Sequence, residues 1–208
     1  MQVTKTFDLD AGVDCLAFVN TLDDRGGERP TELLHEYADL VAFAVQTETL
    51  QEPEARRLTA LAFSRPVDAA AVVSEAIILR ELLYRIFSAV AAECQPDDAD
   101  LQALNGELRA ALGNVELDRV SDAIEWGWLP GTNLHRPLWP IVQSAAELLT
   151  SSEGGRVREC AAHDCEWLFF DESRNRSRRW CNMQTCGNRA KVDRFRARQR
   201  GAEIVETA

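Results

Sequence analysis

The sequence lacks the features of a membrane or secreted protein. No segment of the 208-residue chain approaches the roughly 20 consecutive apolar residues that a bilayer-spanning helix requires. The first ten residues, MQVTKTFDLD, contain neither the basic region nor the apolar stretch of a secretory signal. We therefore expect a cytoplasmic protein that has no membrane partner.

The sequence also lacks the usual signatures of an enzyme. It has three histidines, His35, His135 and His163, which are dispersed, and it contains no nucleophile elbow and no phosphate-binding glycine loop. Cys15 and Cys94 stand alone in apolar helical contexts, so we expect them to be small buried hydrophobes rather than nucleophiles. We therefore expect no catalytic residue and no enzymatic activity.

Basic residues are few, and their distribution is uneven. The chain has 23 Lys and Arg against 34 Asp and Glu, and the resulting formal charge of −11 argues, as an average, against nucleic acid as a partner. Residues 156–200, however, hold 12 basic and 6 acidic side chains, whereas residues 1–155 hold 11 and 26. An acidic body, at −15, therefore carries a basic C-terminal segment, at +6.

The apolar pattern of the body is mainly helical. Apolar residues recur at spacings of three and four in the segments 11–22, 31–46, 52–64, 67–94, 98–112 and 134–150. In the longest segment, an apolar stripe runs from Ala71 through Ile78 to Val90, and Arg80 falls outside it. Prolines and Asp or Thr residues precede several of these segments, as is typical of helix starts. These patterns predict a mainly α fold.

Two short segments interrupt the helical pattern. Val115, Leu117 and the run 126–129 predict a short β-hairpin, with its turn at residues 118–122. The stretch 151–155, with the sequence SSEGG, predicts a flexible joint where the charge changes sign. We place the domain boundary there, giving an acidic helical domain at 1–153 and a basic domain at 154–202.

Four of the six cysteines form two close pairs, Cys160-x4-Cys165 and Cys181-x4-Cys186. In a reducing cytosol this spacing favours a metal site over disulfides, and two thiolate pairs suit one tetrahedral, structural Zn²⁺. Four unliganded thiols, an iron–sulfur cluster and a catalytic zinc are the weaker alternatives, the last because a four-cysteine site is closed. His163 could replace a cysteine, but we favour an exposed loop residue.

The residues around the pairs predict a treble-clef-like finger, made of a β-hairpin and a helix. Segments 156–159 and 167–170 can pair, with the first two cysteines in the knuckle between them. Gly187 allows backbone amides to approach the Cys186 sulfur, and Asn188 is a suitable cap for a helix that extends to Arg200. The last ligand would then lie at the positive end of a helix, which stabilises a thiolate.

The tetrad from Cys186 to Arg189, CGNR, together with the cysteine pairs and a basic helix, resembles the CGNR zinc-finger family. The segments 16–21, 32–34 and 39–43, with the sequences LAFVNT, ELL and DLVAF, resemble the ABATE domain that accompanies this finger in bacteria. The two resemblances cover nearly the whole chain. They imply a stress-induced transcription regulator whose four cysteines bind zinc and whose finger binds DNA, and they bring no catalytic residue.

The arginines of the finger favour nucleic acid as a partner. Arg174, Arg176 and Arg178 alternate, so they would share one face of an extended segment, and the basic residues of the last helix would bracket an apolar stripe. We predict DNA contacts from Arg174, Arg176, Arg178, Arg179, Arg189, Lys191, Arg194, Arg196 and Arg198. In the alternative, the finger docks on the acidic body or on a symmetry mate. DNA binding and docking on the body are compatible if the acidic body masks the finger until a ligand or partner releases it.

Two groups in the body predict a pocket for a small-molecule effector. Asn20 and Arg25 follow an apolar helix, and Trp128 and His135 lie in an aromatic cluster. The alternatives are a helix end with local hydrogen bonds and an aromatic core. The predicted protein is a zinc-containing, DNA-binding regulator with a helical sensor or interaction domain. The second interpretation is a ligand-binding or protein-interaction protein in which zinc is structural or supports a homodimer.

Overall fold

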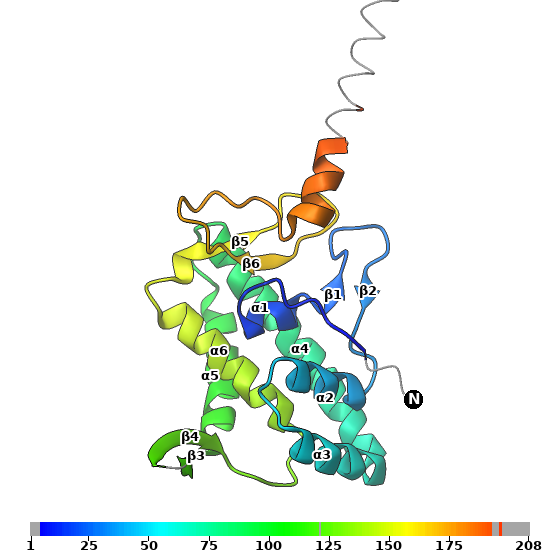
Figure 1. Ribbon diagram of the computed structural model, residues 1–208, viewed down its shortest axis with the longest axis vertical. Helices are drawn as coiled ribbons and strands as arrows, with labels where there is room; N and C mark the ends of the chain where they lie inside the picture. The colour runs from blue at the N-terminus through cyan, green and yellow to red at the C-terminus, as the bar shows by residue number, and fades with distance from the viewer. Residues whose placement is uncertain (1–4, 121, 193–195, 197–208) are drawn as a thin grey trace, which may run out of the picture.

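The computed structural model describes residues 5–120, 122–192 and 196, and the structural findings below refer to these residues. Helices build most of the body (Figure 1), which confirms the predicted mainly α fold. They are α1 (Asp14–Val19), α2 (Tyr37–Gln46), α3 (Glu52–Ser64), α4 (Pro66–Ala91), α5 (Asp98–Leu112) and α6 (Trp139–Thr150). The predicted bounds of α3 and α5 agree with the structure.

Local sequence explains where the helices begin. Pro66 occupies the first turn of α4, where a missing amide proton costs no hydrogen bond. The Asp97 side chain accepts a hydrogen bond from the Ala99 amide and so caps α5. Glu36 and Asp39 form a capping box that starts α2 at Tyr37. The predicted helix 31–46 is therefore too long at its start, because residues 31–32 pair as a strand.

Helix α4 packs on α1, α2, α3, α5 and both strands of the C-terminal hairpin. Its buried side differs from the predicted stripe. Ala71 and Ile78 point to solvent, and Arg80, expected outside, is 2% exposed. Arg80 tolerates burial because Glu32 binds it through two hydrogen bonds of 2.6 and 2.7 Å. The buried residues of α4, from Ala69 through Ala76 and Leu83 to Phe87, still recur at spacings of three and four, but in the first half of the helix they lie on a different side from the predicted stripe.

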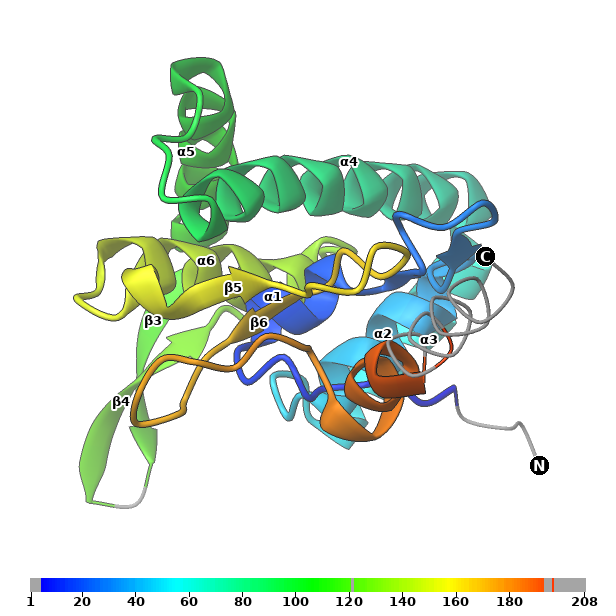
Figure 2. The same cartoon turned by 90° about the horizontal axis from the view of Figure 1, so that it is seen from above.

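Three antiparallel hairpins complete the fold. They are β1 (Leu22–Asp23) with β2 (Thr31–Glu32), β3 (Val115–Val120) with β4 (Ala123–Trp128), and β5 (Val157–Glu159) with β6 (Leu168–Phe170). The predicted hairpin after α5 is confirmed, although its strands continue to Val120 and Ala123, so the turn is shorter than 118–122. Figure 2 shows that β3 and β4 project from the body as an arm.

The C-terminal hairpin lies across α1, at the end of the molecule opposite β3 and β4 (Figure 1). Val157 and Leu168 are fully buried and belong to the same hydrophobic core as the helices. The four paired cysteines and Phe169 form a second, smaller core. The predicted boundary at residues 153 and 154 lies in the turn after α6, but the core continues across it. No helix in the described part of the chain has the length and apolar character needed to cross a membrane.

Candidate metal centre and nucleic-acid interface

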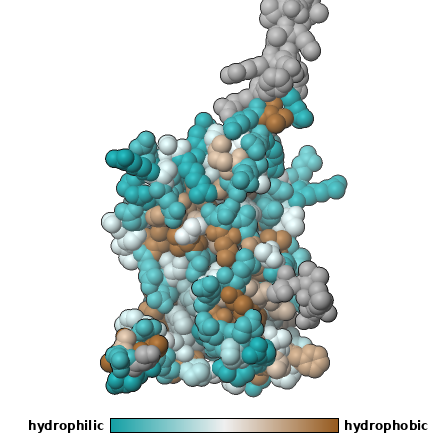
Figure 3. All heavy atoms as spheres, viewed as in Figure 1, coloured by the Kyte–Doolittle hydropathy of each residue, from teal (hydrophilic) through white to brown (hydrophobic). Residues whose placement is uncertain are grey.

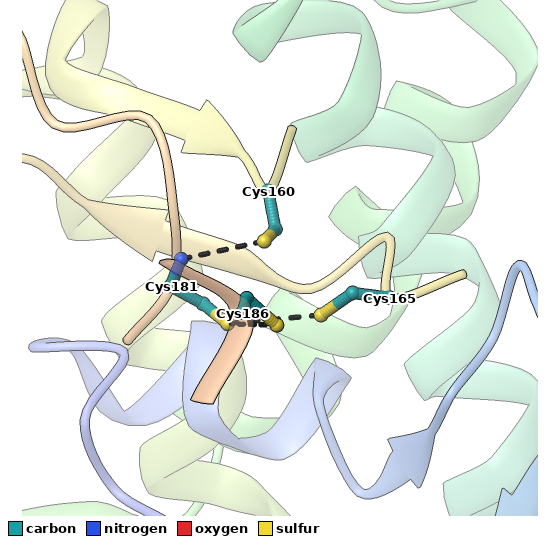
Figure 4. Close-up of side chains that lie close together, drawn as sticks. All are labelled: Cys160, Cys165, Cys181 and Cys186. Carbon is teal, nitrogen blue, oxygen red and sulfur yellow. Dashed lines mark hydrogen bonds between the residues drawn. The ribbon is translucent and has the colours of Figure 1, made fainter. Parts of the chain in front are cut away.

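The four paired cysteines converge on one point (Figure 4). Cys160 directly follows β5, Cys165 lies in the loop before β6, and Cys181 and Cys186 come from the next loop and helical turn. All four are buried, and their sulfur atoms lie within 4.8 Å of one another. The Cys165–Cys181 and Cys181–Cys186 sulfur distances are both 3.6 Å.

These distances fit one Zn²⁺ ion. Four sulfur atoms placed 2.3 Å from a tetrahedral zinc are separated by about 3.8 Å. A disulfide requires about 2.05 Å between sulfur atoms, so the cysteines are free thiols in position to bind metal. The side chain of His163 is 93% exposed, so it does not belong to this buried cluster. The site is thus a closed, four-cysteine site for one structural zinc, as the sequence predicts.

Two groups beside the sulfurs favour the thiolate form that zinc requires. Within the cluster itself, hydrogen bonds from the Cys165 and Cys181 thiols lower the pKa of Cys160 and raise the pKa of the two donors. The Cys181 amide also points at the Cys160 sulfur, at 3.4 Å. On the other side of the cluster, Nη2 of Arg189 donates to the Cys186 sulfur at 3.2 Å. The CGNR arginine therefore contacts a zinc ligand directly and places a positive charge beside it.

The helical turn that holds Cys186 begins earlier than predicted. Asn182 caps it by accepting a hydrogen bond from the Gln184 amide, and a wide turn spans Met183–Gly187. Asn188 is therefore not the cap; its side chain donates to the Gln184 carbonyl instead. A Cβ atom on Gly187 would lie 2.8 Å from the Met183 sulfur, so this glycine lets Met183 pack close to the turn. Helical residues continue to Val192.

Two of the predicted DNA-contacting arginines are engaged inside the finger. The Arg178 guanidinium stacks 4.5 Å from the Phe169 ring and donates to the carbonyls of Trp180 and Cys181. Arg189 forms a 2.9 Å ion pair with Asp164 in the first knuckle, in addition to its contact with Cys186. Arg189 therefore links the two cysteine pairs, and Arg178 links the second pair to Phe169 of β6.

The other predicted DNA-contacting residues that the structure describes are exposed. They are Arg174, Arg176, Arg179, Lys191 and Arg196; Arg194 and Arg198 lie outside the described residues. The predicted alternation along an extended segment is wrong, because residues 173–176 form a turn in which Arg176 has a φ of +50°. The turn displays Arg174 and Arg176 at the surface, while Arg178 folds back. The acidic body does not bury these exposed side chains.

The finger is joined to the body by contacts that the sequence did not reveal. Asn20, at the end of α1, exchanges two hydrogen bonds with the backbone of Leu168 in β6. The loop between β1 and β2 lies against the first knuckle, where a Cβ atom on Gly26 would come within 2.9 Å of the His163 carbonyl oxygen. The loop sequence RGG therefore serves close packing of two backbones.

The acidic residues of the finger contribute to the same junction. Ser88 of α4 donates to Glu159 at 2.8 Å, and Tyr84 donates to Glu166 at 3.1 Å. Asp171 is fully buried and accepts hydrogen bonds from the backbone amides of Ser173 and Arg178. These acids thus turn inward or toward α4, whereas Glu172 is exposed beside the loop that carries Arg174, Arg176 and Arg179.

The four residues of the predicted effector pocket lie apart and are engaged within the chain. Asn20 is buried against β6, and Arg25 forms a bidentate pair with Glu81 while its guanidinium lies 4.0 Å from the Tyr84 ring. Trp128 packs on Trp139. The ring of His135 contacts Glu75 at 2.5 Å and lines a separate, open hollow of about 440 Å³. The structure does not bring them together into one site.

The two isolated cysteines differ from each other. Cys15 is fully buried in α1, as expected, and burial raises the pKa of its thiol to about 12. Cys94 follows the end of α4 and is exposed, so the prediction that it is buried is wrong. The apolar spacing predicted a helix that continues to residue 94, but α4 ends at Ala91, so Cys94 lies beyond the helix.

Comparison with known families accounts for both parts of the chain. The profile of the ABATE family, described as "Putative stress-induced transcription regulator", matches residues 12–152. The profile of the CGNR zinc finger matches residues 156–199. No curated protein matches the chain in sequence. The two matches meet in the turn between α6 and β5 and confirm the resemblance noted from the motifs.

Proposed function

This chain belongs to the ABATE family and carries a CGNR zinc finger, and we propose that it is a transcription regulator whose finger binds DNA. One observation carries the proposal. Arg174, Arg176 and Arg179 lie within six residues of one loop, and all three are exposed. A dense group of exposed guanidinium groups on an otherwise acidic protein suits a polyanionic partner.

The arginines of the finger fall into two groups, and this division supports the assignment of the exposed group as a DNA-binding surface. Arg178 and Arg189 neutralise and brace the finger from within, as their contacts with the Trp180 carbonyl and with Asp164 indicate. The guanidinium groups of Arg174, Arg176 and Arg179 are exposed and accessible to DNA, and that of Arg179 lies 5.3 Å from the centroid of the Trp180 ring. Arginine presents a planar set of donors that matches two phosphate oxygens or the O6 and N7 acceptors of guanine.

Zinc supplies structure rather than chemistry in this proposal. When bound, it neutralises thiolates and ties the segment containing residues 160–165 to the segment containing residues 181–186. Arg174, Arg176 and Arg179 lie in the loop between these anchored pairs. The metal site therefore fixes both ends of the loop, which reduces the entropy that the loop would lose on binding DNA.

We further propose that the helical body senses a signal or a partner and passes it to the finger. The contacts of Asn20 with β6 and of the 24–27 loop with the first knuckle connect the two parts directly. A shift of α1 or of this loop would move the first cysteine pair. A ligand or partner would carry the signal by binding more tightly to the body when the loop is in one position than when it is in the other.

The first test compares two triple variants that remove the same charge. Arg174, Arg176 and Arg179 are replaced by Ala in one variant, and the exposed body residues Arg56, Arg57 and Arg109 in the other. Binding of zinc-loaded protein to pooled genomic fragments is measured by fluorescence anisotropy at low salt. We expect the first variant to lose at least about tenfold in affinity and the second to match the unsubstituted protein. Equal affinities for all three proteins would contradict the proposal.

A second candidate function follows from the shared core. Because Val157 and Leu168 pack with the helices, the zinc module could serve the architecture of a protein that binds other proteins or ligands. In that case the zinc-loaded protein shows no detectable binding to pooled DNA at low salt. Zinc removal still lowers the stability of the whole chain in both cases, so DNA binding is the discriminating measurement.

A further inference from the structure

The arm formed by β3 and β4 has two chemically different faces. Cross-strand pairs place Val115 opposite Trp128, Leu117 opposite Trp126 and Arg119 opposite Ile124 on one face. The other face carries Glu116, Asp118 and Glu125, with Asp118 directly opposite Glu125. Like charges opposite each other do not stabilise a hairpin, so the apolar face must supply the stabilisation.

That apolar face is covered at its base and uncovered at its tip. At the base, Trp128 packs against Trp139 of α6, with ring centroids 5.7 Å apart. Toward the tip, Leu117 and Ile124 are each 66% exposed, and Trp126 is 78% exposed. Figure 3 shows apolar side chains on this arm beside hydrophilic ones. A contiguous apolar surface on a projecting hairpin is typical of a protein–protein contact.

The same arm borders a hollow that can receive such a tip. The hollow has a volume of about 390 Å³ and lies between the apolar face and the neighbouring helices. Its lining includes Leu112 at the end of α5, Trp126 and Trp128 on β4, and Gln143 and Glu147 on α6. An apolar tip and a hollow with both apolar and polar walls therefore occur side by side on one molecule.

We propose that the arm binds a second copy of this chain in a two-fold symmetric dimer. In such a contact each surface meets itself, so the tip of each arm enters the hollow of the other copy. The charges are complementary in this arrangement. Arg119 shares the apolar face and has no ion-pair partner in the described part of its own chain, while Glu147 lines the hollow and accepts a hydrogen bond from Gln143. Arg119 of each copy then pairs with Glu147 of the other.

The position of the arm supports a second copy as its occupant. The arm and the finger lie at opposite ends of the molecule (Figure 1), so dimerisation leaves both basic loops exposed. The acids Glu116, Asp118 and Glu125 on the reverse face disfavour an anionic membrane or nucleic acid at this arm. The dimer is independent of the proposed DNA binding, because different residues form the two surfaces.

The test measures the oligomeric state of the full, zinc-loaded chain by sedimentation equilibrium over a wide range of protein concentration. We expect a monomer–dimer equilibrium that the double variant Leu117→Ser and Trp126→Ser weakens by at least about tenfold. The matched control is Phe63→Ser, which removes an aromatic side chain that is 90% exposed and lies outside the arm. Circular dichroism and zinc content of each variant establish that it is folded.

A charge exchange tests the register of the contact. Arg119→Glu and Glu147→Arg should each weaken the dimer, and the double variant should restore it, because the ion pair is re-formed with reversed sign. Arg57→Glu, an exposed charge reversal on α3, should have no effect. A chain that stays monomeric at every concentration would overturn the proposal. A dimer that is insensitive to all the substitutions in the arm would overturn it as well, because another surface would then form the dimer.

Discussion

The side chain of Asn20 is hydrogen bonded to the backbone of Leu168 as a neighbouring strand would be. Its Nδ2 donates to the Leu168 carbonyl at 2.8 Å, and its Oδ1 accepts from the Leu168 amide at 3.0 Å. Both groups are buried, and 148 residues separate them in sequence. One amide side chain thus satisfies the edge of β6 and attaches the zinc finger to α1. The finger and the helical body are therefore joined through a buried side chain.

Replacing Asn20 by Asp tests this attachment. The carboxylate keeps an acceptor for the Leu168 amide but loses the donor, and it places negative charge against the Leu168 carbonyl. We expect a loss of about 2–4 kcal/mol in the free energy of unfolding, measured by urea titration, because buried polar groups lose their partners. Asn133→Asp, at an exposed position, is the control and should change stability by less than about 0.5 kcal/mol. Equal stability of the two variants would show that the attachment contributes nothing.

Substitutions at Arg189 test its role beside the metal. Because Arg189 contacts the Cys186 sulfur and pairs with Asp164, Arg189→Ala should weaken zinc binding by about 10- to 100-fold in chelator competition. Lys191→Ala removes a nearby exposed charge and should leave zinc affinity unchanged. Both variants lose one positive charge, so a difference between them reports the contact with the cluster. If Lys191→Ala had the larger effect, Arg189 would not be the residue that supports the site.

Glu32 should make stability depend on acidity. Burial raises the pKa of Glu32, but hydrogen bonds from Arg80 and the Leu34 amide lower it more, so the pKa in the folded protein lies below the ordinary value of 4.5. A lowered pKa contributes stability above pH 4.5, which is lost as the pH falls through the folded pKa. We expect Glu32→Gln to cost about 2 kcal/mol at pH 7 and progressively less below pH 4.5, measured by urea titration.

The control for this pH dependence is Glu52→Gln, because Glu52 and Arg56 form an exposed pair on α3. Exposed pairs contribute little, so this variant should follow the unsubstituted protein at each pH. A cost of Glu32→Gln that stays constant between pH 7 and pH 3 would contradict the assignment.

Thiol labelling tests the environments of the six cysteines. In the zinc-loaded protein, iodoacetamide should modify one cysteine, Cys94, because Cys15 is buried with a pKa raised to about 12 and the other four bind metal. Chelation should increase the number of reactive thiols to at least five. Mass spectrometry of peptides locates each label. Rapid modification of Cys160 or Cys181 in the presence of bound zinc would contradict the closed site.

Local signals predicted much of this structure. The spacing of apolar residues, with proline or aspartate at the starts, gave the bounds of α3 and α5, and alternation gave the hairpin of β3 and β4. The spacing of Cys160, Cys165, Cys181 and Cys186 predicted the metal site because thiolate pairs need tight turns, and tight turns are local. These features depend on residues that are close in sequence.

The features that sequence did not predict depend on distant residues. Arg80 is buried because β2 delivers Glu32 to it, and periodicity along α4 carries no information about that strand. The roles of Arg178 and Arg189 depend on Phe169 and Asp164, which the knuckle brings to them. Counting arginines therefore did not separate Arg178 and Arg189, which form hydrogen bonds inside the finger, from the other predicted DNA-contacting arginines. The RGG sequence of the 24–27 loop was visible, but its partner, the backbone of His163, was not.

The salt dependence of DNA binding tests the central claim most directly. For contacts with phosphates, the logarithm of the binding constant falls linearly with the logarithm of salt concentration, by about 0.9 per phosphate neutralised. We predict that replacing Arg174, Arg176 and Arg179 by Ala reduces the magnitude of this slope by about 2 to 3, whereas replacing Arg56, Arg57 and Arg109 leaves it unchanged. An equal slope for both variants, or no binding by zinc-loaded protein at low salt, would contradict the assignment of the finger as a DNA-binding surface.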